Sequence, residues 1–100
     1  MKTEEDRRAL AIGRALATLR AARGWSQKEL AAKIGIGPAH MSLVENGKRY
    51  LGISALGSAA FALGVLMQDI LALASRQDPR DDANVGLIVR LSIQAGLEED

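Results

Sequence analysis

The segment SQKELAAKIGIGPAHMSLVENGKR, residues 26–49, predicts two short helices joined by a sharp turn. Ser26 followed three residues later by Glu29 is a capping box, in which the two side chains satisfy free amide groups at the start of a helix. We therefore expect the first helix over residues 27–34. Gly35 then supplies the turn, because glycine reaches the left-handed backbone conformation without steric cost.

The second helix of this segment is expected from Pro38 to about Asn46. Proline is tolerated at the first helical position, where its missing amide hydrogen is not needed. Small and apolar residues fall where the two helices and the turn must pack together, at Leu30, Ala31, Ile34, Gly35, Ile36, Met41 and Val44. These are the packing positions of a helix-turn-helix motif.

Helical spacing predicts three more helices around this pair. Apolar side chains recur at that spacing over residues 3–22, and Arg23-Gly24 then ends the first helix. Ser54 can cap a fourth helix that Gly64 ends, and a fifth helix covers about residues 67–74. The expected fold class is therefore all-α.

Composition limits the chain to one small domain. One hundred residues suffice for one hydrophobic core, and the 48% of hydrophobic residues with only 3% aromatics favour small, closely packed helices. No cysteine is present, so neither disulfides nor a thiolate metal site is expected. No apolar stretch approaches the roughly 18 residues that span a bilayer, and no export signal is recognised, so a cytoplasmic location is expected.

The net charge of +1 conceals an uneven distribution of charge along the chain. Residues 1–75 carry ten Lys and Arg against six Asp and Glu, whereas residues 76–100 carry three against six. Residues 7–50 alone carry nine against two. A polyanion would therefore meet a local excess of positive charge there, which favours nucleic acid as the partner.

A charged, proline-containing linker, SRQDPRDD, separates the helical unit from the end of the chain. We expect a DNA-binding domain over residues 1–75 and an extension over residues 76–100 for dimerisation or for binding a protein partner. The stretch VGLIVRLSI alternates apolar residues from Val85 to Ile93, as a strand does. A helix through the same region also fits, and the pattern leaves both open.

Residues 9–74 resemble the phage-repressor-like (Xre/Cro-type) helix-turn-helix family. The resemblance rests on LRAARGWSQKELAAKIGIGPAHMSLVENGKR followed by AAFALGV, in which the sharp-turn glycine, the SQKELA entry and the ENGKR exit arrive in register. It implies a five-helix DNA-binding domain. One helix of the motif would rest over the DNA backbone while the second, residues 38–46, enters the major groove.

The resemblance also implies which side chains meet DNA phosphates. Gln27 opens the first helix of the motif, and Lys48 and Arg49 follow the second, so all three are expected to contact phosphate. Arg23 and Lys28 are weaker candidates, because a cation on a helix surface is most often only solvated. An arginine and a glutamate, Arg20 and Glu45, fall where the family pairs such residues, and we expect a buried structural ion pair.

The helix expected to read bases lacks the long polar side chains that family members usually place there. Met41 and Val44 must face the core, which leaves a short groove-facing set: Pro38, Ala39, His40, Ser42 and Leu43. Only His40 and Ser42 can form hydrogen bonds. We expect specificity to come partly from apolar contact with thymine methyl groups and partly from DNA shape; the alternative is a helix that no longer reads sequence.

Catalysis, metal binding and a cofactor are not expected. His40 is the one histidine, and without cysteine a metal site has little to build on. Trp25 is expected to pack against the core, and no nucleophile stands with an orienting base.

The sequence thus predicts a sequence-specific regulator of duplex DNA, a repressor acting as a homodimer. The alternative is an antitoxin-like or phage-type regulator that binds a protein partner. The uncovered apolar surfaces expected for dimerisation are Ile70, Leu71, Leu73 and residues 85–93.

Overall fold

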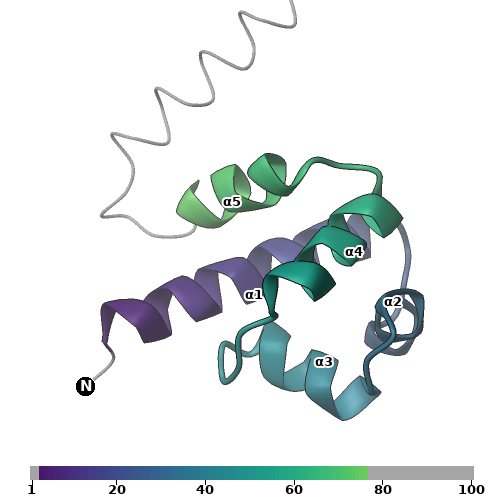
Figure 1. The fold of residues 1–100 in the computed structure, drawn as a ribbon, viewed down its shortest axis with the longest axis horizontal. Helices are drawn as coiled ribbons and strands as arrows, with labels where there is room; N and C mark the ends of the chain where they lie inside the picture. Colours follow the sequence, from purple (N-terminus) through teal and green to yellow (C-terminus); the bar gives the residue numbers. More distant parts are fainter. Residues whose placement is uncertain (1–2, 77–100) are drawn as a thin grey trace, which may run out of the picture.

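The computed structural model describes residues 3–76, which form five helices and no strand, so the all-α fold class is confirmed for this part of the chain (Figure 1). The expected strand or helix at residues 85–93 lies outside the described residues. The helices are α1 (Glu4–Ala22), α2 (Gln27–Ile34), α3 (Pro38–Glu45), α4 (Ile53–Leu63) and α5 (Met67–Arg76).

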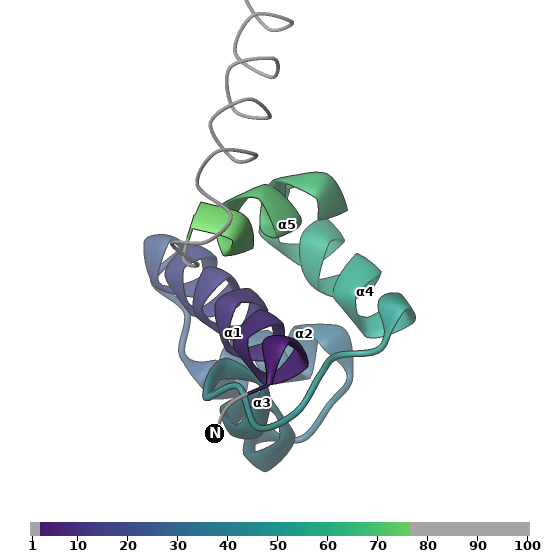
Figure 2. The same cartoon turned by 90° about the vertical axis from the view of Figure 1, so that its left-hand side faces the viewer.

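Helix α1 is the longest of the five helices and contacts α2, α3 and α5, whereas α4 packs on α2 and α5. Helix α1 packs against α5 on one side and α3 on the other, and α2 contacts both α3 and α4. Figures 1 and 2 show α5 above α1 and α3 below it in two perpendicular views. The two helices of the motif therefore lie together on one side of the domain, away from α5.

The ends of the helices follow the local sequence, with one exception. Ser26 and Glu29 form the expected capping box, and Gly35 adopts the left-handed conformation at the end of α2 with a φ of 74°. Ser54, however, does not cap α4, so that expectation was wrong. The capping residue is Gly52, two residues earlier, which makes no side-chain hydrogen bond, and the helix begins at Ile53.

The core lies among the five helices, and small residues let the backbones approach closely. Ala15, Ala31 and Ala59 are fully buried, as are the larger Leu16, Leu30, Met41, Leu63, Ile70 and Val44. Trp25 packs against this cluster as expected. Ile70 was expected on an uncovered apolar surface and is instead buried, because α5 turns this side chain toward α1 and the core.

Glycine makes the contact between α1 and α3 possible. A Cβ at Gly13 would overlap the carbonyl oxygen of Val44 and lie 3.0 Å from Cα of Glu45. A Cβ at Gly47, where φ is 73°, would lie 2.7 Å from Cα of Leu10. The end of α3 thus rests directly on the backbone of α1 at two levels.

The ion pair expected between Arg20 and Glu45 is present and fastens the same contact. Nε of Arg20 donates to Oε2 of Glu45 at 2.8 Å, and Nη2 donates to Oε1 at 2.9 Å. Nη1 of Arg20 also donates to the carbonyl of Trp25 at 2.7 Å. The hydrogen bond to Glu45 raises the pKa of Arg20 above its usual value. Among the described residues no buried side-chain nitrogen or oxygen lacks a hydrogen bond.

No single helix of residues 3–76 is long and apolar enough to cross a membrane; α4 and α5 together meet that test only as a pair bent by 95°.

The last helix ends at Arg76, one residue beyond the expected limit of the helical unit. The assignment of residues 76–100 as a separate extension stays a prediction.

Replacing Gly13 with alanine should lower the free energy of unfolding by about 1–3 kcal/mol, because the added methyl group overpacks the contact between α1 and α3. Gly57 offers a matched control within a helix, since a Cβ there meets no atom within 4 Å. Gly57→Ala should raise stability by about 0.5–1 kcal/mol. Urea unfolding of both variants measures the difference; equal responses would contradict the close contact.

Replacing Glu45 with alanine should lower the free energy of unfolding by about 3–5 kcal/mol, because it leaves the guanidinium of Arg20 without its buried partner. The side chain of Glu45 is only 4% exposed. The exposed pair between Arg8 and Glu4 is the control, with side chains more than 60% exposed. Arg8→Ala should change stability by less than about 1 kcal/mol. A thermal melt of Glu45→Ala that matches wild type would exclude a stabilising role for the pair.

Candidate nucleic-acid interface

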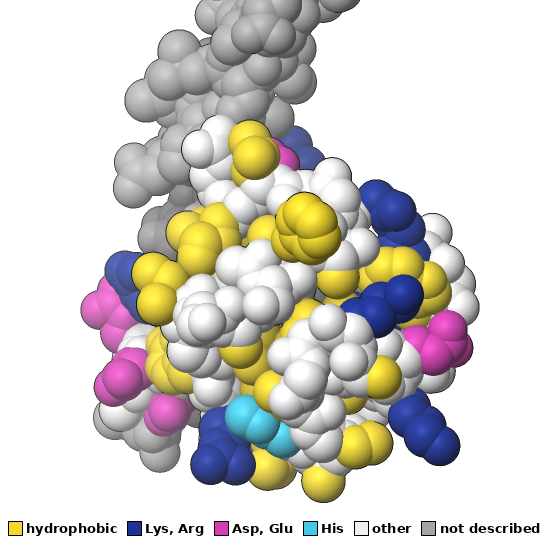
Figure 3. Space-filling model, turned by 45° about the vertical axis from the view of Figure 1, so that its right-hand side comes forward, with side chains coloured by type: hydrophobic (Ala, Val, Ile, Leu, Met, Phe, Trp, Pro, Cys, Tyr) yellow, Lys and Arg dark blue, Asp and Glu magenta, His cyan; other side chains and the backbone are white. Residues whose placement is uncertain are grey.

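The outer face of α3 carries the residues that the sequence predicts for base reading. Pro38, Ala39 and Leu43 are exposed, and His40 and Ser42 are half-buried. Met41 and Val44 face the core, as the helical spacing requires. Figure 3 shows the histidine beside apolar and basic side chains at the lower edge of the molecule. The exposed face of α3 is therefore short and largely apolar.

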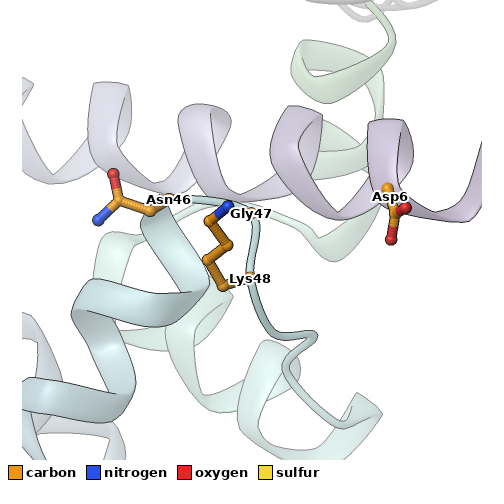
Figure 4. A pocket seen from close by; sticks show the side chains of 4 residues that line it. All are labelled: Asp6, Asn46, Gly47 and Lys48. Atoms are coloured by element: carbon orange, nitrogen blue, oxygen red, sulfur yellow. The ribbon is translucent and has the colours of Figure 1, made fainter. Parts of the chain in front are cut away.

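Lys48 and Arg49 lie directly after α3, on the segment that returns toward α4. The amide of Lys48 donates to the carbonyl of Leu43 at 2.9 Å, and Gly47 turns the chain in the left-handed conformation. Both cations are exposed. Figure 4 shows Asn46, Gly47 and Lys48 beside α1, whose first turn carries Asp6. These four residues line a shallow pocket of about 240 Å³.

Tyr50 joins this segment to the start of α1, which the sequence reading missed. Its hydroxyl donates to the backbone carbonyl of Glu5 at 2.5 Å, across 45 residues of chain. Burial raises the pKa of Tyr50, and the charge of Glu5 raises it further, so the hydroxyl keeps its proton and remains a donor. No local pattern signals this bond, because its acceptor is a main-chain atom of a distant helix.

Gln27 stands at the first position of α2 and is half-buried. Its Nε2 donates to Oε1 of Glu45 at 3.0 Å, the same oxygen that receives Nη2 of Arg20. The structure thus joins Gln27 to the buried ion pair, a link that the sequence did not predict. An amide nitrogen has two hydrogens, so one remains for another acceptor. Lys28, the next residue, is exposed.

Arg23, a candidate for phosphate contact, has a hydrogen-bond partner within the protein. Its Nη2 donates to the carbonyl of Leu63 at the end of α4, and its guanidinium lies beside Gly64. This carbonyl belongs to the last turn of a helix, where main-chain acceptors have no partner within the helix. Arg23 therefore ties the turn between α1 and α2 to α4. Arg23 lies thirteen residues along the chain from Leu10, the residue of α1 on which Gly47 rests. Along a helix this is a distance of about 20 Å, so Arg23 is far from Gly47.

Residues 3–76 contain no group of three or more His, Cys, Asp or Glu side chains that could hold a metal ion. What the surface presents is an exposed helix, two adjacent cations and the first turn of a second helix. This arrangement suits the major groove of duplex DNA with phosphates on either side of it.

Comparison with known proteins gives the same interpretation. Residues 11–73 match the family model described as a helix-turn-helix domain. No curated protein matches the chain. A crystal structure of the clp gene regulator ClgR from C. glutamicum is similar, with 32% identity and a TM-score of 0.65 over 68% of this chain and 87% of that one.

Two further solved structures are similar. Another crystal structure of ClgR from Corynebacterium glutamicum shares 27% identity, with a TM-score of 0.66 over 92% of this chain and 90% of that one. The restriction-modification controller protein C.AhdI from Aeromonas hydrophila shares 29% identity, with a TM-score of 0.60 over 62% and 94%. With the family model covering most of the described residues, the chain belongs to the helix-turn-helix domain family, as a non-enzymatic DNA-binding transcription regulator of the Xre/Cro type.

Proposed function

We propose that this chain is a repressor that binds a two-fold symmetric operator in duplex DNA as a homodimer in the cytoplasm. The observation that carries the proposal is the placement of the exposed face of α3 next to Lys48 and Arg49. A reading helix needs cations beside it to hold the duplex, because phosphate contacts fix the register of a protein on DNA. The similarity to ClgR, a gene regulator, and to C.AhdI, a controller protein, supports this role.

Phosphate binding is assigned to both sides of α3. Lys48 and Arg49, which we call the phosphate clamp, lie after the helix, and Gln27 and Lys28 open α2. Arg23 is left out of this set because its guanidinium is bound to Leu63. Displaced counterions make such binding strongly dependent on salt.

Base reading is assigned to the apolar face of α3. Ala39 and Leu43 are exposed and one turn apart, and Pro38 precedes them. Such side chains recognise the methyl group of thymine, whereas hydrogen bonds to base edges are left to Ser42 and His40. Discrimination at each base pair is therefore modest, and DNA shape contributes the rest.

The homodimer is proposed from the apolar residues that the described part of the chain leaves uncovered. Phe61 is 89% exposed and Ile53 79% exposed, and both lie on α4, which contains no charged residue. Leu66 and Leu71 add to this exposed apolar surface. Apolar side chains protrude on the face drawn in Figure 3. A two-fold related copy would cover them and set two reading helices about one turn of DNA apart.

The proposed readout predicts different responses from two sets of substitutions. Lys48→Ala and Arg49→Ala should each weaken binding to all duplexes alike and reduce the slope of log affinity against log salt by about 1. Ala39→Gln and Leu43→Gln should instead change which operator is preferred. Selection of bound sequences from a random duplex library, followed by titration at several salt concentrations, measures both effects.

Uracil in place of thymine throughout the selected site provides the control for apolar reading, since this exchange removes only methyl groups. Affinity should fall with uracil. Unaltered affinity would contradict the contacts assigned to Ala39 and Leu43. Equal affinity of the wild-type chain for the selected site and for random duplex would show that α3 does not read sequence.

Phe61→Asp should convert the dimer to a monomer at micromolar concentration, because it places a charge within an apolar interface. Sedimentation analysis measures the change. Leu43→Gln is the matched control, since Leu43 is also an exposed apolar residue, 43% exposed, but lies on the reading helix. It should leave the dimer intact. A wild-type chain that stays monomeric with and without operator would contradict the proposal.

A further inference from the structure

The segment that carries the phosphate clamp has fixed ends and an exposed middle. At one end Gly47 rests on the backbone of Leu10, and at the other Leu51 is buried in the core, only 8% exposed. Lys48, Arg49 and Tyr50 between them are exposed and belong to no helix. Holding three such residues in one conformation costs backbone entropy, so a bond within this stretch decides how ordered the two cations are.

The amide of Lys48 is held by the carbonyl of Leu43, and the side chain that fastens this stretch is that of Tyr50. Its hydroxyl reaches the main-chain carbonyl of Glu5 in the first turn of α1. A carbonyl oxygen has two lone pairs, so it can accept this bond in addition to a bond within the helix. Tyr50 as a whole is 40% exposed, so packing alone holds its ring loosely and the hydroxyl supplies the specific contact.

We propose that Tyr50 is a positioning residue for the phosphate clamp, whose hydroxyl fastens the chain next to Arg49 to α1. The inference rests on the proposed function, because it concerns the contact that Lys48 and Arg49 make with DNA. Tyr50 itself contacts no phosphate in this role. It raises the fraction of molecules in which both cations already stand where the backbone of the duplex will lie, and affinity is reduced in proportion when that fraction falls.

Because the acceptor, the carbonyl of Glu5, belongs to α1, this helix supports the DNA-binding surface without contacting DNA itself. The same helix holds Gly13 against α3 and pairs Arg20 with Glu45, so the reading helix and the clamp are fixed to one rigid element. Tyr50 adds a second attachment to α1, on the other side of the clamp from Gly47. The spacing between base contacts and phosphate contacts is then set by α1 rather than by the connecting loop.

The test uses the full chain with Tyr50→Phe, which keeps the ring and removes the hydroxyl. The dissociation constant for duplex DNA should rise by about two- to tenfold, which is the range of one net hydrogen bond. The salt slope should stay unchanged, because both cations are still present.

Thr18→Val is the matched control. Thr18 also donates its hydroxyl to a main-chain carbonyl of α1, that of Arg14 at 2.9 Å, but it lies far along the helix from the clamp. It should leave the dissociation constant unaltered.

A double-mutant cycle separates positioning from direct contact. In a chain that already carries Lys48→Ala and Arg49→Ala, Tyr50→Phe should have no further effect on the dissociation constant. An equal effect in both backgrounds would overturn the proposal, because Tyr50 would then act independently of the clamp. Thermal melting of each variant must show that the protein is folded at the temperature of the titration.

A measurement without DNA keeps this inference distinct from the proposed function. The amide of Lys48 donates to the carbonyl of Leu43, so its hydrogen exchange reports the order of the segment. Tyr50→Phe should speed the hydrogen exchange of this amide severalfold in the free protein. An unchanged exchange rate together with an unchanged dissociation constant for duplex DNA would overturn the positioning role. If the wild-type chain bound no duplex at any salt concentration, the proposed function would fail, and faster exchange would still support the attachment of the segment by Tyr50.

Discussion

The contact between α1 and the end of α3 is the constraint on which the rest of the structure depends. Gly13 lets the two backbones meet, and Arg20 with Glu45 fastens them by a bidentate ion pair. An exposed helix of eight residues is too short to hold its own position in water. Because α3 is held by α1 at its end, its outer face can stay uncovered and still keep a fixed orientation.

The same contact connects the groups assigned to DNA binding. Glu45 accepts from Gln27 as well as from Arg20, so the start of α2 is held to the end of α3. Gly47 and Tyr50 hold the following segment to α1. Two hydrogen bonds thus prearrange this surface, the half-buried bond from Gln27 to Glu45 and the exposed bond from Tyr50 to Glu5. This arrangement lowers the entropy that binding would otherwise have to overcome.

The unusual feature of this chain is the contrast between a well-anchored framework and a sparsely polar reading face. Arg23, which sequence alone placed near phosphate, is engaged at the far end of α1 and stabilises the end of α4. The two exposed cations that directly follow α3 are Lys48 and Arg49. The proposed function would divide DNA recognition on this surface into two tasks, with register set by phosphates and selection left to small apolar contacts.

Local patterns in the sequence determined the limits of α2, the turn at Gly35 and the inward face of α3, because capping and helical spacing act within a few residues. The tertiary structure decided the burial of Ile70, the partner of Arg23 and the bond from Tyr50 to Glu5. Each of these depends on a residue far away along the chain, and for the last two the acceptor is a main-chain carbonyl, which every residue possesses. Residue type and spacing therefore carry no signal for them, and only the packing of the helices brings donor and acceptor together.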